Sequence, residues 1–130
     1  MAKKKTQEKK KMTAREIRTF TSKKLDTVSV LAQSGKKVEG MVYMFYIIAW
    51  LVEDKFDIKK PISATVREFL SSLVMEKNFP PDNVYPYLSF FEEALYSHHE
   101  LPEELYRTHM ALWTNLYRDV TGDTPPNFTL

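Results

Sequence analysis

Twelve consecutive residues near the middle of the chain, MVYMFYIIAWLV at positions 41–52, are all apolar or aromatic. A membrane-spanning helix needs about 20 such residues, so this run is too short to cross a bilayer. We therefore expect a helix over residues 37–54 that is buried on nearly every side, at the centre of the fold. A buried strand is the alternative, because Val, Tyr, Phe and Ile favour sheets. The length of the run and the lack of alternating apolar segments elsewhere favour the helix.

Two further helices are predicted from capping patterns followed by apolar side chains at three- and four-residue spacing. The segment Thr13–Glu16 matches a capping box, in which the Thr hydroxyl and the Glu carboxylate bond to each other's backbone amides. Gly35 is the natural stop for this helix. The next one opens at Ser63 or at a second capping box, Thr65–Glu68. Its inner face is expected to consist of Val66, Phe69, Leu70, Leu73 and Val74.

Two more helices are predicted in the last third of the chain. Asn78 ends the preceding helix, and Asp82 is expected to cap the next one, with Pro86 tolerable only in its first turn. Pro102 is expected at the first position of the last helix, which Gly122 closes. The apolar arc of that last helix comprises Leu105, Tyr106, His109, Met110, Leu112, Trp113, Leu116, Tyr117 and Val120.

Together these segments predict an all-α protein, a compact bundle of about five helices around the apolar helix at 37–54. Residues 13–122 form its single helical domain. The lysine-rich residues 1–12 cannot nucleate a core, so we expect a disordered basic arm there. Residues 123–130 form a C-terminal tail that contains two prolines and cannot continue the helix.

The charges are sorted along the sequence. Residues 1–24 carry ten basic and two acidic side chains, residues 25–77 carry seven of each, and residues 78–130 carry two basic and eight acidic ones. The chain has no Cys, which excludes thiol nucleophiles, thiolate zinc sites and disulfides. Three scattered Gly residues leave no glycine loop for a phosphate.

The arm is a candidate for contact with nucleic acid or another anionic surface. Clustered lysines neutralise phosphates and release counterions without reading sequence. The arm has neither Arg nor an aromatic residue, so any contact would be electrostatic and sensitive to salt. A terminus that only aids solubility is the alternative. The candidate contact residues are Lys3, Lys4, Lys5, Lys9, Lys10 and Lys11.

Tyrosine is concentrated between residues 85 and 117. Tyr85, Tyr87 and Tyr96 cannot all face inward from one helix, so at least one of them should be exposed. Because Tyr is favoured at interfaces, we predict an acidic, Tyr-rich surface that binds a protein partner or a second copy of the chain. The candidate interface residues are Tyr85, Tyr87, Glu92, Glu93 and Tyr96.

The histidines give weak support to a metal site. His98 and His99 are adjacent and point in different directions, and no pair of His residues has the i,i+4 spacing of a zinc protease. His109 falls on an apolar arc, where we expect a hydrogen-bonded core histidine. No nucleophile or acid–base motif is present, so we predict no metal, no cofactor and no catalytic residue.

The sequence is thus most consistent with a small, soluble, cytoplasmic, non-enzymatic interaction protein, with a protein partner or a homodimer as its complex. The first alternative is a nucleic-acid-associated protein that uses the lysine arm. The second is a small-ligand binder or an enzyme with a pocket between the helix at 37–54 and the last helix.

Overall fold

The chain was analysed as a computed structural model, which describes residues 11–60, 64–96 and 101–126. The described residues form five α-helices and no strand, which confirms the predicted all-α class. The helices are α2 (Ala14–Gln33), α3 (Lys37–Phe56), α4 (Val66–Lys77), α5 (Pro81–Tyr96) and α6 (Glu103–Thr121).

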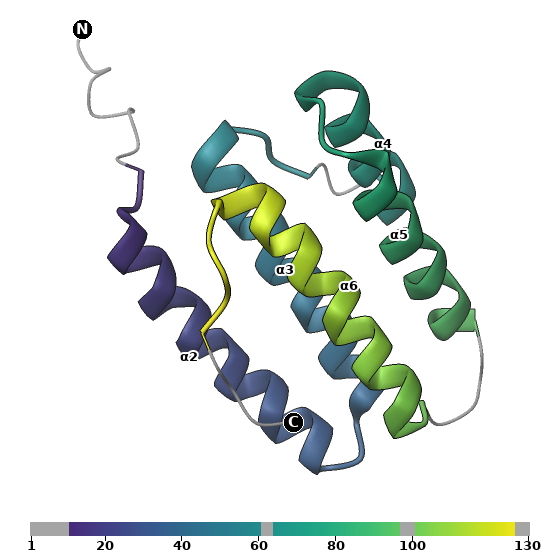
Figure 1. Ribbon diagram of the computed structural model, residues 1–130. Helices are drawn as coiled ribbons and strands as arrows, with labels where there is room; N and C mark the ends of the chain where they lie inside the picture. The colour runs from purple at the N-terminus through teal and green to yellow at the C-terminus, as the bar shows by residue number, and fades with distance from the viewer. Residues whose placement is uncertain (1–10, 61–63, 97–100, 127–130) are drawn as a thin grey trace, which may run out of the picture.

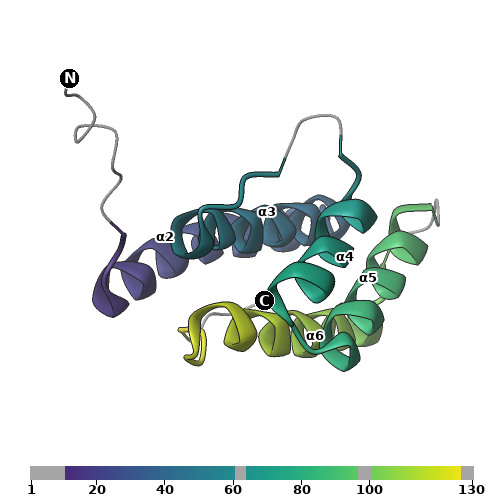
Figure 2. The same cartoon turned by 90° about the horizontal axis from the view of Figure 1, so that it is seen from above.

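The central helix is α3, as its apolar sequence predicts. It packs against α2, α5 and α6, whereas α4 packs against α5. Figure 1 shows α2, α3 and α6 lying alongside one another, and Figure 2 shows α2 and α3 in one layer with α5 and α6 in the other. Ten of the twenty residues of α3 are buried. None of the helices in the described ranges is long and apolar enough to cross a membrane.

Two buried hydrogen bonds fix α6 against the first layer. The Trp113 indole N–H donates to the Met44 carbonyl of α3 at 2.9 Å. The hydroxyls of Tyr117 and Thr21 lie 3.0 Å apart and join α6 to α2. Both bonds connect residues that are far apart in the sequence, so they fix the register of the two layers within a largely apolar core.

The helix ends follow the predicted local signals. Thr13 and Thr65 each form a complete capping box, at the starts of α2 and α4. Asn78 and Gly122 end α4 and α6 in the left-handed conformation, with φ of 60° and 78°. Gly35 follows α2 with φ of 79°. Thr65 is therefore the cap of α4, while the alternative, Ser63, lies outside the described residues.

The start of α5 differs from the prediction. Asp82 lies inside the first turn and is not the cap, because the helix begins one residue earlier, at Pro81. Pro86 is therefore the sixth helical residue, beyond the first turn, where it cannot bond to the Asp82 carbonyl. Both Pro86 and Asp82 are exposed, so water can take the place of that bond. Pro102 also differs by one position, since it is the N-cap of α6.

Two residues of the predicted arm, Lys11 and Met12, contact the helices. The Lys11 ammonium donates to the Asp54 carbonyl at 3.0 Å, near the end of α3, and Met12 packs against the core. Residues 1–10 lie outside the described part of the chain. In the predicted tail, the Thr124 carbonyl accepts a hydrogen bond from Arg18 of α2 at 3.2 Å.

Candidate binding surfaces

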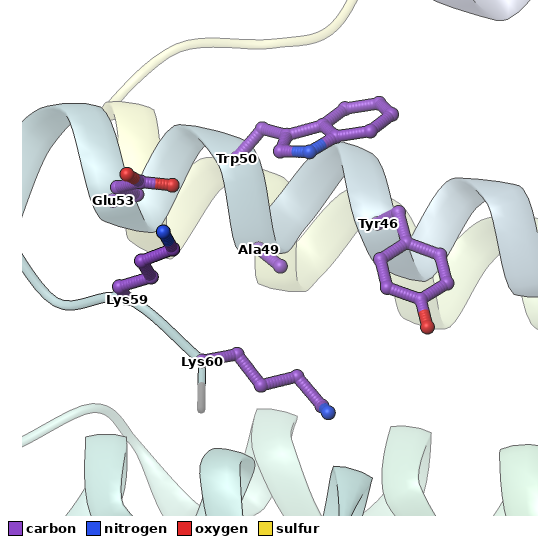
Figure 3. A pocket seen from close by; sticks show the side chains of 6 residues that line it. All are labelled: Tyr46, Ala49, Trp50, Glu53, Lys59 and Lys60. Carbon is purple, nitrogen blue, oxygen red and sulfur yellow. The ribbon is translucent and has the colours of Figure 1, made fainter. Parts of the chain in front are cut away.

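One stripe of α3 stays open to solvent. Tyr46 and Trp50 are 42% and 37% exposed, although they belong to the apolar run that was expected to be buried on nearly every side. They lie four residues apart and therefore share a face of the helix. Figure 3 shows the Trp50 ring lying along α3 and the Tyr46 ring projecting from the helix on the side of Lys60.

Trp50 is the centre of an aromatic cluster that also includes α2. Its ring centroid lies 6.1 Å from that of Phe20, 5.8 Å from that of Tyr43 and 6.3 Å from that of Tyr46. The Lys24 ammonium lies 4.9 Å from the Trp50 centroid and 5.5 Å from that of Phe20, within the range of a cation–π interaction. The cluster therefore joins four aromatic rings and a cation from α2 and α3.

A hollow of about 270 Å³ lies beside this cluster. Figure 3 shows Ala49 on its helical wall, Lys59 extending toward Glu53 at one end, and Lys60 on the opposite side. The Lys60 ammonium also donates to the Ala64 carbonyl at 2.7 Å. The lining residues are Tyr46, Ala49, Trp50, Glu53, Lys59 and Lys60.

The hollow combines two ammonium groups, one carboxylate, a phenol and an indole. Such a set suits a ligand with an anionic part and a flat or apolar part. We call the surface formed by Phe20, Tyr43, Tyr46, Trp50, Lys24, Lys59 and Lys60 the aromatic–lysine face.

The aromatic–lysine face was not predicted from the sequence. The sequence does contain a signal for it. The aromatic residues of the apolar run that carry a polar group follow three- and four-residue spacing and so share one side of the helix: Tyr43, Tyr46 and Trp50. Such residues favour positions that are partly in contact with water. The lysines that complete the face come from α2 and from the segment after α3, and no local pattern links them to it.

The predicted interface residues on α5 do not form one surface. Tyr87 is fully buried, so its assignment to a surface is wrong: the phase of α5 turns it toward α6, where its ring centroid lies 5.4 Å from that of His109. Tyr96 is 78% exposed, which confirms that one of the three tyrosines faces solvent. Glu93 is exposed and Tyr85 is half-buried.

Glu92 has a structural partner. Its carboxylate accepts two hydrogen bonds from the Arg67 guanidinium of α4, at 3.0 and 2.7 Å. This pairing lowers the pKa of Glu92 and raises that of Arg67, chiefly through the hydrogen bonds themselves. Glu92 therefore joins α4 to α5 and is less available to an outside partner than Glu93.

Three exposed apolar side chains lie in the turns where α5 ends and α6 begins. Leu95 and Tyr96 lie in the last turn of α5, and Leu105 lies in the first turn of α6. Figure 1 shows these two turns at the same end of the bundle. The carboxylates Glu93 and Glu104 in these turns are also exposed, and so is Glu103, which is paired with Arg107 at 2.9 Å. We call the surface formed by Glu93, Leu95, Tyr96, Glu103, Glu104 and Leu105 the acidic end.

Of the six candidate lysines in the arm, the structure describes one. Lys11 is held at the end of α3, where its ammonium contacts the Asp54 carbonyl and the Asp57 carboxylate, at 3.0 and 3.1 Å. Lys3, Lys4, Lys5, Lys9 and Lys10 lie outside the described residues. They precede Lys11 in the chain, and Lys11 itself is held at the end of α3.

His109 is a core residue, but it is not hydrogen-bonded as expected. It is fully buried, and both of its ring nitrogens lack a hydrogen-bond partner. The buried hydroxyls of its neighbours Tyr87 and Tyr106 lack one as well. Burial lowers the pKa of His109 to about 3, so the ring is neutral at physiological pH.

The remaining sequence candidates are not brought together. His98, His99 and Glu100 fall outside the described residues, and among those described no three His, Asp or Glu side chains are grouped for a metal ion. The predicted pocket between α3 and α6 would lie where the Trp113 indole is fully buried and bonded to Met44. A second hollow lies elsewhere, between α2 and the tail, lined by Arg18, Thr19, Ser22, Lys23 and Pro126.

Comparison with known proteins leaves the geometry as the sole guide to function. No protein-family model, no curated protein and no solved structure matches this chain.

Proposed function

We propose that this chain is a non-enzymatic interaction protein that binds a protein partner through the acidic end. The observation that carries the proposal is the exposure of Tyr96, 78%, together with that of two further apolar residues at the same end of the bundle, Leu95 and Leu105. Exposed apolar residues among charged ones are typical of an interaction site. Tyr is also among the residues that contribute most to binding when an interface covers them.

The charges of the acidic end favour a basic partner over a second copy of the chain. In a twofold dimer the same surface meets itself, so Glu93 and Glu104 would approach the same carboxylates of the other copy. Like charges that face each other across an interface are unfavourable. A partner with Lys or Arg side chains around one apolar anchor would complement both the carboxylates and Tyr96.

Affinity capture with the full chain, followed by titration of each purified candidate, tests this proposal. Tyr96→Ser removes the apolar anchor, so we expect it to raise the Kd for a genuine partner by about tenfold or more. Met75→Ser is the matched control, because Met75 is equally exposed, at 79%, but lies on α4. A partner that binds both variants equally would contradict the proposal.

Light scattering on the same proteins tests the choice between a partner and a second copy. We expect the wild-type chain to be monomeric at concentrations of about 100 μM, since a symmetric dimer would bring carboxylates together. A stable dimer that Tyr96→Ser dissociates would show that the acidic end binds another copy.

A further inference from the structure

The aromatic–lysine face lies on α2, α3 and the segment after α3, so it shares no residue with the acidic end. The regions that form it are also basic: residues 11–60 carry ten basic and six acidic side chains, whereas residues 81–126 carry two basic and eight acidic ones. Whatever binds the aromatic–lysine face therefore differs in charge from the partner proposed for the acidic end.

We propose that the aromatic–lysine face binds single-stranded nucleic acid. Exposed aromatic rings beside lysines are the two elements of such sites, because unpaired bases stack on the rings while the ammonium groups contact phosphates. Tyr46 and Trp50 supply rings that are more than one-third exposed. Lys59 and Lys60 supply the ammonium groups in the hollow beside them.

The single acidic residue of the hollow fits the same ligand. A carboxylate repels phosphates, but it accepts hydrogen bonds from the exocyclic amino groups of bases. Glu53 lies at one end of the hollow and Lys60 lies across from the helix that carries Glu53 (Figure 3). This arrangement places a base near Glu53 and Trp50, with the sugar–phosphate chain along the lysines.

Binding by the face has to be distinguished from binding by the lysines that precede it in the chain. Lys11 is fixed at the end of α3 through Asp54 and Asp57, and residues 1–10 carry five more lysines. Clustered lysines contact phosphates independently of sequence. The arm alone offers no ring for stacking, whereas the folded face does. The contribution of Trp50 therefore separates this proposal from binding by the arm alone.

A single strand is favoured over the other anionic polymers. In a duplex the base faces are stacked inside, so the rings of Tyr46 and Trp50 would find no partner. An acidic peptide matches the lysines but offers few flat surfaces for several rings. A lipid surface is broad, whereas half of this site is a hollow of about 270 Å³ beside a helix.

Fluorescence anisotropy with the full chain and a labelled single-stranded oligonucleotide of about 12 nucleotides, at about 50 mM salt, tests the proposal. Trp50→Leu keeps an apolar contact with Phe20 but removes the stacking surface, and we expect it to raise the Kd about tenfold. The double variant Lys59→Gln/Lys60→Gln should weaken binding and reduce the salt slope by about one to two.

Two control variants exclude general effects of surface change. Tyr96→Leu removes an exposed aromatic residue from the acidic end, and Lys77→Gln removes an exposed lysine from α4. Both should bind the oligonucleotide as the wild type does. Thermal unfolding of every variant identifies losses that come from misfolding, and quenching of tryptophan fluorescence by the unlabelled oligonucleotide reports stacking in the unmutated chain.

Four results would overturn the proposal. They are no binding by the full chain, equal binding by Trp50→Leu, equal affinity for a duplex of the same sequence, and equal competition by polyglutamate or anionic vesicles. The proposal does not depend on the partner at the acidic end, because Tyr96→Ser tests that partner and leaves the aromatic–lysine face intact.

Discussion

Asp54 connects the start of α2 to the end of α3. It is almost fully buried, and its carboxylate oxygens accept from the Met12 backbone N–H at 3.2 and 3.4 Å. The Lys11 ammonium donates to its backbone carbonyl. This contact places the first turn of α2, and the chain before it, against the central helix.

Asp54→Ala should therefore lower the free energy of unfolding by about 1–2 kcal/mol, because it leaves a part-buried N–H without an acceptor. Asp54→Asn keeps an acceptor oxygen and should lower the free energy of unfolding by less than Asp54→Ala does. Asp57→Asn is a second control, since Asn also tolerates the left-handed backbone of Asp57 (φ of 59°) and the change removes only an ion pair of the weak surface kind with Lys11, from a side chain that is 75% exposed. Urea unfolding measures all three, and equal losses would contradict the role given to Asp54.

His109 makes stability depend on pH. Its pKa is about 3 in the folded chain, below the ordinary value of 6.5, because burial disfavours the charged ring. Below about pH 6.5 the unfolded chain takes up a proton that the folded chain does not, so stability is full above that pH and falls as the pH drops towards 3.

His109→Leu removes this titration. Between about pH 8 and pH 5 the wild type should lose about 2 kcal/mol more than the variant does. At about pH 8 the variant should be at least as stable as the wild type, because the buried ring nitrogens have no partners. Urea unfolding at the two pH values measures this difference. A stability gap that stays constant with pH would mean that His109 has the same pKa in the folded and the unfolded chain, and would contradict this prediction.

At the scale of the helices, the capping boxes are the clearest local determinants. Thr65 accepts from the Glu68 N–H at 3.0 Å, and the Glu68 carboxylate accepts from the Thr65 N–H at 3.0 Å. The helix that they start, α4, has only 12 residues and packs against α5. A short helix depends strongly on its ends, because the ends are a large share of its backbone groups.

Thr65→Ala should therefore destabilise the protein by about 1 kcal/mol. Thr108→Ala is the matched control, because Thr108 is an exposed residue inside α6 whose hydroxyl bonds to the Glu104 carbonyl of its own helix. Alanine has the higher helix propensity at such a position, so this change should be neutral or slightly stabilising. Chemical unfolding compares the two, and a loss for Thr108→Ala as large as that for Thr65→Ala would contradict the role of the cap.

Features that depend on neighbouring residues in the chain could be predicted, and those that depend on packing could not. Thr13, Thr65, Asn78 and Gly122 mark helix ends through bonds within one turn, and the structure has those ends where the sequence predicts them. The burial of Tyr87 and the exposure of Trp50 depend on which face each helix turns to its neighbours. That choice is made by contacts between helices distant in sequence.

At the scale of the whole molecule, folding separates the charges that the sequence already sorts. The basic regions become α2, α3 and the segment after α3, and the acidic region becomes α5 and α6, in the other layer (Figure 2). Each side also has exposed aromatic side chains, Tyr46 and Trp50 on one and Tyr96 on the other. The same arrangement therefore underlies both proposals, a negatively charged ligand at the aromatic–lysine face and a positively charged partner at the acidic end.

The chain provides its own reporters for this arrangement. It has two tryptophans, and their indole N–H groups give separate signals in a two-dimensional ¹H–¹⁵N spectrum. Trp50 is in the aromatic–lysine face, whereas the Trp113 N–H is buried and bonded to the Met44 carbonyl. A ligand on the aromatic–lysine face should therefore shift the first signal and leave the second in place.

The most direct measurement is this spectrum, recorded on the full chain with a single-stranded oligonucleotide and separately with an oligolysine peptide. We predict that the oligonucleotide shifts the Trp50 indole signal and not the backbone amides of Tyr96 and Leu105. The peptide should do the converse, and the Trp113 signal should stay unchanged in both. The account would be contradicted if both ligands shifted the same residues. It would also be contradicted if neither ligand shifted the Trp50 signal or the amides of Tyr96 and Leu105.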